Sequence, residues 1–166
     1  MKSTVLILLI TFGAFICNKS DENIKKTFLG NWSYCDNNGN YTEVHVNERI
    51  LEWCPEVDPL GIPYNYKLIN DSIYIDCLIN DTDNRNGKIE KISNNQLLLI
   101  FKVSENKFDS LTLIRINQPI SFAQDILRTN DTIEEKDYLL SYKKRLTEKS
   151  CNKVKKKSLG ELELVE

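Results

Sequence analysis

The feature that most constrains this fold is a regular succession of short β-prone runs between Asn31 and Ile116. The runs are rich in β-branched and aromatic residues, and turn-forming segments rich in Asn and Gly separate them. We predict eight strands, at residues 31–35, 41–46, 49–54, 63–69, 72–79, 88–92, 96–103 and 109–116. No connection has room for a crossover helix, so neighbouring strands pair antiparallel. Closing the sheet removes both edges, which predicts a mainly β, eight-stranded antiparallel up-and-down barrel.

Loop lengths distinguish the two ends of this barrel. Connections after the second, fourth and sixth strands span two or three residues, which predicts a closed floor. The longer connections, which we expect to ring a mouth at the other end, are 36–40, 55–62, 80–87 and 104–108. Tyr64 and Tyr66 face the same way on the fourth strand. Together with Pro59 and Ile62, they are our candidates for a ligand mouth.

A helix is predicted after the barrel. The seventh strand is apolar on both faces from Leu97 to Phe101, and the eighth repeats this from Leu111 to Ile116, so their outer surface needs a cover. Thr132–Glu135 has the pattern of a capping box, and apolar residues then recur at helical spacing. We therefore expect an α-helix over 133–149, packed outside strands seven and eight. The segment 119–127 is expected to be a bent or short helical connection.

The amino terminus has the pattern of a signal for export. After Met1-Lys2, an apolar run from Val5 to Ile16 is too short to span a bilayer, and a polar stretch begins just after Cys17. This junction resembles the lipidated cysteine of bacterial lipoproteins, with a Bacteroidetes-like signal. The resemblance implies palmitate-bearing Cys17 and attachment to the outer membrane in the cell envelope, on its periplasmic or surface side. The alternative is that Cys17 is only the last residue of a secretory signal.

Four cysteines remain once Cys17 is set aside: Cys35, Cys54, Cys77 and Cys151. An even set suits an oxidising compartment, so all four are candidate disulfide cysteines. Three connectivities are possible, and the sequence does not choose among them.

Composition and charge fit one globular domain. With 41% hydrophobic and 28% charged residues, the chain is neither disordered nor a multi-span membrane protein. Its net charge of −2 argues against nucleic-acid binding. Residues 143–157 are strongly basic, and the cluster Lys153–Lys157 either touches anionic lipid headgroups or a glycan or is a solvated tail that folds back on the acidic barrel. The expected division is 1–16 signal peptide, 17–23 linker, 24–120 barrel, 121–150 helical segment and 151–166 charged tail.

Two residues suggest a family. Gly30-Asn31-Trp32 opens the first strand after a short helical turn from Ile24 to Leu29, and Arg115 ends the eighth. Over about 24–149 the chain resembles the lipocalin-like group of calycin barrels. The resemblance implies that the Arg115 guanidinium packs over the Trp32 indole as a plug at the barrel floor. It also implies a helix after the last strand.

Little in the sequence indicates catalysis. The single histidine, His45, alternates with Val44 and Val46 and is expected to point outward into solvent. One histidine excludes a multi-histidine metal site, and Asp81–Gly87 departs from a calcium loop. We therefore expect no metal, no cofactor and no enzyme activity.

Two functions remain open. The first is a membrane-anchored, lipocalin-like lipoprotein that binds a small apolar or glycan ligand at the open barrel end. The second is a protein-binding module of the envelope, such as an inhibitor, immunity protein or assembly factor, built on a packed barrel. The interior of the barrel distinguishes them, because ligand pockets usually measure about 300–1,000 Å³.

Overall fold

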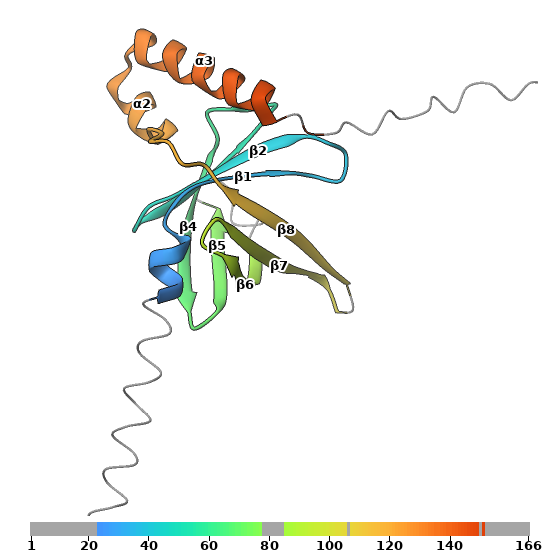
Figure 1. Cartoon of the computed structure of the whole chain (residues 1–166). Helices are drawn as coiled ribbons and strands as arrows, with labels where there is room; N and C mark the ends of the chain where they lie inside the picture. The colour runs from blue at the N-terminus through green and yellow to red at the C-terminus, as the bar shows by residue number, and fades with distance from the viewer. Residues whose placement is uncertain (1–22, 78–84, 106, 150, 152–166) are drawn as a thin grey trace, which may run out of the picture.

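The computed structural model describes residues 23–77, 85–105, 107–149 and 151, and it confirms the predicted barrel (Figure 1). Eight antiparallel strands pair in chain order, and the first pairs with the last. The strands are β1 (Gly30–Cys35), β2 (Tyr41–Val46), β3 (Ile50–Pro55), β4 (Ile62–Ile69), β5 (Ser72–Cys77), β6 (Arg85–Ser93), β7 (Gln96–Ser104) and β8 (Lys107–Arg115).

Strand boundaries at the mouth differ from the predicted ones. β6 begins at Arg85, where the prediction had a loop, because Arg85 pairs with Ile75 of β5. The predicted loop 104–108 is also wrong, since Ser104 pairs with Lys107 in an extended β7–β8 hairpin. These added residues are polar or exposed, so they lack the apolar alternation on which the prediction depended. The expected strand residues 78–79, most of loop 80–87, the segment 1–22 with Cys17, and 152–166 lie outside the described residues.

The helices lie close to the segments predicted from the sequence. A short helix covers 23–28, α2 spans Ala123–Thr129 and α3 spans Thr132–Lys149. The predicted cap is one residue out, because Asp131 Oδ1, not the Thr132 side chain, accepts bonds from the amides of Ile133 (2.8 Å) and Glu134 (3.3 Å). An Asp carboxylate is as good an N-cap as a Thr hydroxyl, so the pattern was ambiguous here. No described helix has the length and apolar character needed to cross a membrane.

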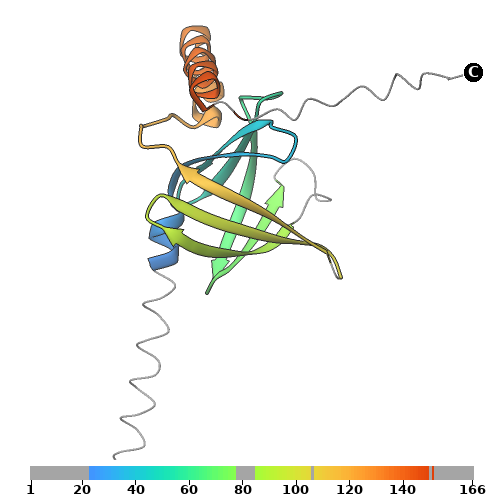
Figure 2. The same cartoon turned by 45° about the vertical axis from the view of Figure 1, so that its right-hand side comes forward.

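The position of α3 differs from the prediction. The helix lies outside the barrel, but over β2 and β3, while β7 and β8 lie on another side (Figures 1 and 2). The Tyr142 hydroxyl donates to the Cys54 carbonyl (3.0 Å), and Arg145 pairs with Glu43 of β2 (2.7 Å). The apolar outer face of β7 and β8 therefore lacks the predicted cover, and Ile114 is 39% exposed. The reason is a buried ion pair between Arg145 of α3 and Glu43 of β2, which fixes the helix over that strand.

Candidate functional site

The floor of the barrel brings Trp32 and Arg115 together. The guanidinium carbon lies 4.1 Å from the centre of the Trp32 ring, and the two residues pair across the β1–β8 seam. Arg115 also donates to the carbonyls of Thr27 (2.7 Å) and Leu29 (3.2 Å), so it ties the short helix 23–28 to the barrel. Gly30 has φ 122°, and a Cβ there would lie 2.7 Å from Arg115 Nη1. The glycine thus permits both the backbone turn and the close approach of the arginine.

Among the described residues, apolar side chains pack together in the interior of the barrel. The buried core consists of Phe28, Trp32, Val44, Val46, Leu51, Tyr64, Ile73, Ile75, Ile89, Leu97, Leu99, Phe101 and Leu113. Among the described residues, the pocket at the mouth measures about 30 Å³ and is lined by Trp53, Tyr64, Ile75 and Arg85. That space suits about one water molecule and is far below a usual ligand cavity.

The residues predicted to shape a ligand mouth serve other roles. Tyr64 is 6% exposed and belongs to the core. Tyr66 lies toward the floor, where its hydroxyl donates to the carbonyl of Asn47 (2.6 Å) in the β2–β3 turn. Ile62 packs against the core, and the carbonyl of Pro59 accepts a hydrogen bond from the Tyr138 hydroxyl of α3 (3.0 Å). The structure therefore does not bring these four residues together at an open mouth.

A buried ionic cluster lies on the outer face of β2, under α3. Glu43 accepts two hydrogen bonds from the guanidinium of Arg145, at 2.7 and 2.9 Å, and one from the Tyr41 hydroxyl at 2.8 Å. His45 Nε2 lies 3.2 Å from the same carboxylate, and Nδ1 lies 3.1 Å from Asn31 Oδ1. His45 points outward as predicted, but it is fully buried, so the predicted solvated histidine is wrong. The strand pattern shows direction but not what lies above the strand.

The charge of Glu43 is stabilised by these partners. Burial alone would raise the pKa of Glu43. The hydrogen bonds with His45 and Arg145 and the positive charge of Arg145 have a larger, opposite effect, so the pKa of Glu43 lies below its usual value. A buried ion pair offsets the cost of its desolvation only with good geometry and further hydrogen bonds, and here Arg145 donates to both Glu43 oxygens and Tyr41 donates to one of them. The cluster therefore fixes α3 in one position along β2.

A second buried carboxylate holds the start of α2. Glu52 of β3 accepts hydrogen bonds from the backbone amides of Ala123 (2.8 Å) and Gln124 (2.9 Å). Burial raises the pKa of Glu52, and these two amides and the nearby His45 lower it only in part. The carboxylate takes the place of a side-chain cap, which Phe122 does not provide. Glu52 thereby attaches the helical segment to the barrel wall.

The three cysteines whose side chains are described form one disulfide and one free thiol. Cys35, at the mouth end of β1, is bonded to Cys151, just beyond α3, and their Cα atoms are 5.7 Å apart. Cys54 was a candidate disulfide cysteine, but it is free and buried beneath α3, with Tyr138 Oη 3.7 Å from its sulfur. Burial raises the pKa of the Cys54 thiol, which opposes a nucleophilic thiolate. The side chain of Cys77 lies outside the described part of the chain.

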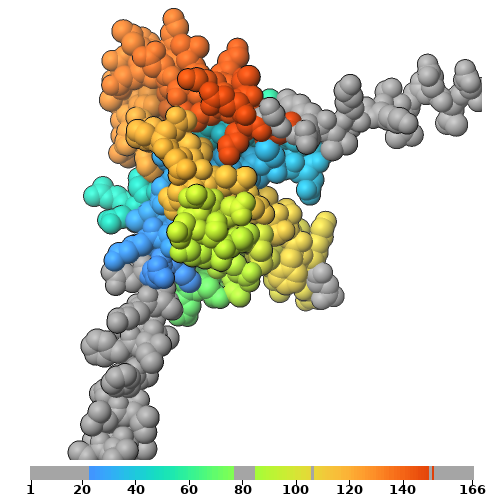
Figure 3. All heavy atoms as spheres, viewed as in Figure 1, coloured from blue at the N-terminus to red at the C-terminus, as the bar shows by residue number. Residues whose placement is uncertain are grey.

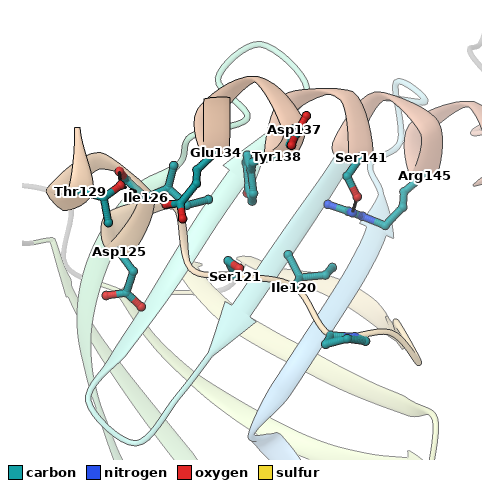
Figure 4. A pocket seen from close by; sticks show the side chains of 11 residues that line it. Ile120, Ser121, Asp125, Ile126, Thr129, Glu134, Asp137, Tyr138, Ser141 and Arg145 are labelled. Carbon is teal, nitrogen blue, oxygen red and sulfur yellow. Dashed lines mark hydrogen bonds between the residues drawn. The ribbon is translucent and has the colours of Figure 1, made fainter. Parts of the chain in front are cut away.

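One pocket lies outside the barrel, between α2, α3 and the segment 119–121 (Figure 4). Its volume is about 380 Å³. Thr129 and Asp125 lie at one end, and Ser141 and Arg145 lie at the other. The remaining lining residues are Pro119, Ile120, Ser121, Ile126, Glu134, Asp137 and Tyr138. We call this pocket the helical groove; α2 and α3 form a ridge beside it in the space-filling view (Figure 3).

The groove combines apolar and acidic surface. Ile126 and Tyr138 are buried apolar residues of the cluster between α2 and α3. Asp125, Glu134 and Asp137 contribute three carboxylates, whereas Arg145 already pairs with Glu43. A groove of this type suits a cationic group on an apolar stem. Among the described residues, no three His, Cys, Asp or Glu side chains are arranged to hold a metal ion.

No protein-family model, no curated protein and no solved structure matches this chain. The site must therefore be interpreted from its own geometry. Sequence reasoning missed the helical groove, because its residues belong to two helices whose mutual arrangement no local pattern encodes. One signal was present: Arg145 recurs with Tyr138 and Tyr142 at helical spacing, which places a charge on the apolar face of α3.

Proposed function

We propose that this chain is a protein-binding module of the cell envelope that engages its partner through the helical groove. The observation that supports this most directly is the contrast, among the described residues, between the pocket at the barrel mouth and the helical groove. The barrel pocket measures about 30 Å³, whereas the groove between α2, α3 and the segment 119–121 measures about 380 Å³. The groove is large enough to admit a side chain of a partner protein, whereas the pocket at the barrel mouth is not.

The chemistry of the groove indicates the kind of partner. Asp125, Glu134 and Asp137 favour a positive charge, and Ile126 and Tyr138 favour the methylene stem that carries it. A lysine or arginine side chain on the partner protein has both properties. We therefore propose that the partner presents a basic segment, as an inhibited enzyme, a toxin or an assembly subunit can do.

Attachment to the membrane belongs to the same proposal. The lipoprotein-like junction at Cys17 supports a lipid anchor, and the contact of Trp32 with Arg115 supports the lipocalin-like resemblance. Labelling cells with a palmitate analogue tests the anchor. We expect label on the natural chain and none on Cys17→Ser, which should leave the membrane fraction.

Site-specific photo-crosslinking in the natural host tests the groove. A photoreactive residue replaces Asp137 in the groove, and the matched control places it at Glu90, an exposed residue of β6. We expect a discrete adduct from position 137 and none from position 90, and Glu134→Lys should abolish it. Equal adducts from both positions, or none from either, would contradict the proposal. Stoichiometric binding of a hydrophobic fluorescent probe within the barrel would instead support a small apolar ligand.

A further inference from the structure

The seam between β1 and β8 is paired over only a short length. Trp32 pairs with Arg115 and Ser33 with Ile114, near the floor. From there toward the mouth the two strands diverge (Figure 2). Within the described residues, no strand pairs with the β1-facing edge of β8 between Phe108 and Leu113. The barrel is therefore closed at its floor and has an open edge along the upper part of β8.

Backbone amides on this open edge have identifiable directions. The amide of Arg115 donates toward β7, to the Asn95 carbonyl (2.9 Å), whereas the amide of Ile116 donates to the Asn31 carbonyl (2.8 Å) beside β1. Successive amides alternate along a strand, so the even-numbered amides of β8 face the open edge. One of them, the amide of Ser110, donates to the adjacent Asp109 Oδ1 (2.9 Å) instead of a neighbouring strand. Such an edge is a template for another strand.

Apolar side chains flank the same edge on both faces of the sheet. On the inner face, Leu111 packs against the core but is only partly buried. On the outer face, Phe108 is 62% exposed and Ile114 is 39% exposed. An added strand whose apolar side chains face the core would cover the partly exposed Leu111 and satisfy the edge amides at the same time.

One segment of the chain has the matching pattern. Residues 161–164 read Glu-Leu-Glu-Leu, in which acidic and apolar residues alternate as in a half-buried strand, and Val165 and Glu166 follow. We propose that residues 161–166 add to the open edge of β8 as a further strand of the barrel wall. Leu162 and Leu164 face the core beside Leu111, whereas Glu161, Glu163 and Val165 lie on the outer face of the sheet. Lys102 and Lys107, exposed at the hairpin end, provide opposite charge.

The disulfide fixes the start of the linker to this segment at the mouth end of β1. Cys151 is held at Cys35, at the mouth end of β1. If the pairing of Ser33 with Ile114 continued in register, Cys35 would lie opposite Thr112, within the open edge. The ten residues from Cys151 to Glu161 can span up to about 35 Å. A six-residue edge is about 20 Å long, so the linker reaches every position along it.

Hydrogen exchange of the purified full chain, followed residue by residue by NMR, tests this proposal. We expect the amides of Phe108, Ser110 and Thr112 to exchange at least tenfold more slowly in the full chain than in a chain that stops at Ser158. The amides of Leu111 and Leu113 face β7 and serve as internal controls, with unchanged rates.

Two variants with matched side-chain size sharpen the test. Leu162→Asp/Leu164→Asp should lose the protection, whereas Leu162→Val/Leu164→Val should keep it. A peptide of residues 159–166 should restore protection to the chain that stops at Ser158. Equal exchange rates in the full and the shortened chain would overturn the proposal. Protection that depends on protein concentration but not on residues 159–166 would also overturn it and would indicate a second copy at the edge. The purified sample contains no partner protein for the helical groove, so these results are independent of the proposed function.

Discussion

The two sides of the barrel wall use their outer faces in opposite ways. The covered wall, β1 to β3 beneath α2 and α3, buries polar side chains completely, including Glu43, His45 and Glu52. The bare wall, β6 to β8, leaves apolar side chains in solvent, and Ile92 and Phe108 are more than half exposed. Apolar outer residues alone therefore did not determine where the helix packs.

Specific polar contacts explain the difference. A helix that covered the bare wall would bury apolar surface, but many such positions are nearly equivalent, because the hydrophobic effect is not directional. The covered wall offers Glu43 for one guanidinium and Glu52 for the start of one helix. Each contact requires a defined geometry, so together they select one docking position. The comparison teaches that charged residues can determine where a helix packs on a barrel when the apolar residues of the barrel do not.

The largest expected effect comes from breaking the ionic cluster of the covered wall. Arg145→Met leaves the Glu43 carboxylate buried without its partner, and we expect a loss of about 3–5 kcal/mol in the free energy of unfolding. Urea denaturation measures it. The control is the double variant Glu43→Gln/Arg145→Met, which removes both charges and should recover most of the loss. A single variant as stable as the natural chain would show that α3 does not depend on this pair.

The disulfide provides the next test, because it fastens the end of α3 to the covered wall. Cys35 and Cys151 are separated by 116 residues in sequence. Replacing both with Ser should lower the free energy of unfolding by about 2–4 kcal/mol, since the unfolded chain gains freedom. The control Cys54→Ala changes the free thiol instead and should leave the disulfide intact by mass spectrometry. Loss of the Cys35–Cys151 bond in that control would contradict the assignment.

Gly30→Ala tests the floor, where both walls meet. The new Cβ would lie 2.7 Å from Arg115 Nη1, at a backbone φ of 122° that residues other than glycine rarely adopt. We expect a loss of about 1–3 kcal/mol in thermal or urea unfolding. Gly39→Ala, in the β1–β2 turn, is a control at another positive φ (78°), and its loss should not depend on Arg115. The additional variant Arg115→Ala should therefore reduce the effect of Gly30→Ala but not that of Gly39→Ala.

The covered wall should also respond to acid. Because the pKa of Glu43 is lower in the folded chain than its usual value near 4.5, its stabilising contribution is present above pH 4.5 and is lost as the pH falls further. Unfolding midpoints between pH 7 and pH 3 measure this loss. The Glu43→Gln/Arg145→Met variant should lose less stability over the same range. The raised pKa of Glu52 acts in the opposite direction, because its contribution is present at low pH and declines as the pH rises.

The smallest effect is expected on the bare wall. Ile92 is 53% exposed on β6, so Ile92→Thr removes little buried surface. We expect a change within about 0.5 kcal/mol in the free energy of unfolding. A loss several times larger, measured in the same urea experiment, would show that the bare wall is covered in solution.

Local pattern was sufficient for the barrel but not for the site. Alternation and turn residues predicted all eight strands, and the Gly30-Asn31-Trp32 signature with Arg115 predicted a contact between residues far apart in sequence. The strands follow from backbone periodicity, whereas the contact was what the lipocalin-like resemblance implied, and closure of the barrel was consistent with it. The choice of covered wall, the burial of His45 and the free state of Cys54 depend on which side of the barrel α3 reaches. That choice is made by pairs such as Glu43 with Arg145, which no window of sequence contains together.

The pairing of Trp32 with Arg115 has a consequence for the order of folding. These residues are 115 − 32 = 83 positions apart, so a growing chain cannot shelter the indole until its last strand has been made. The strands between them can form hairpins in turn, each from nearby residues. Closure then requires the two most distant strands to meet, which is the slow kind of step in a β protein. Until the barrel closes, the nascent chain exposes hydrophobic surface and unpaired strand edges of the kind that chaperones bind.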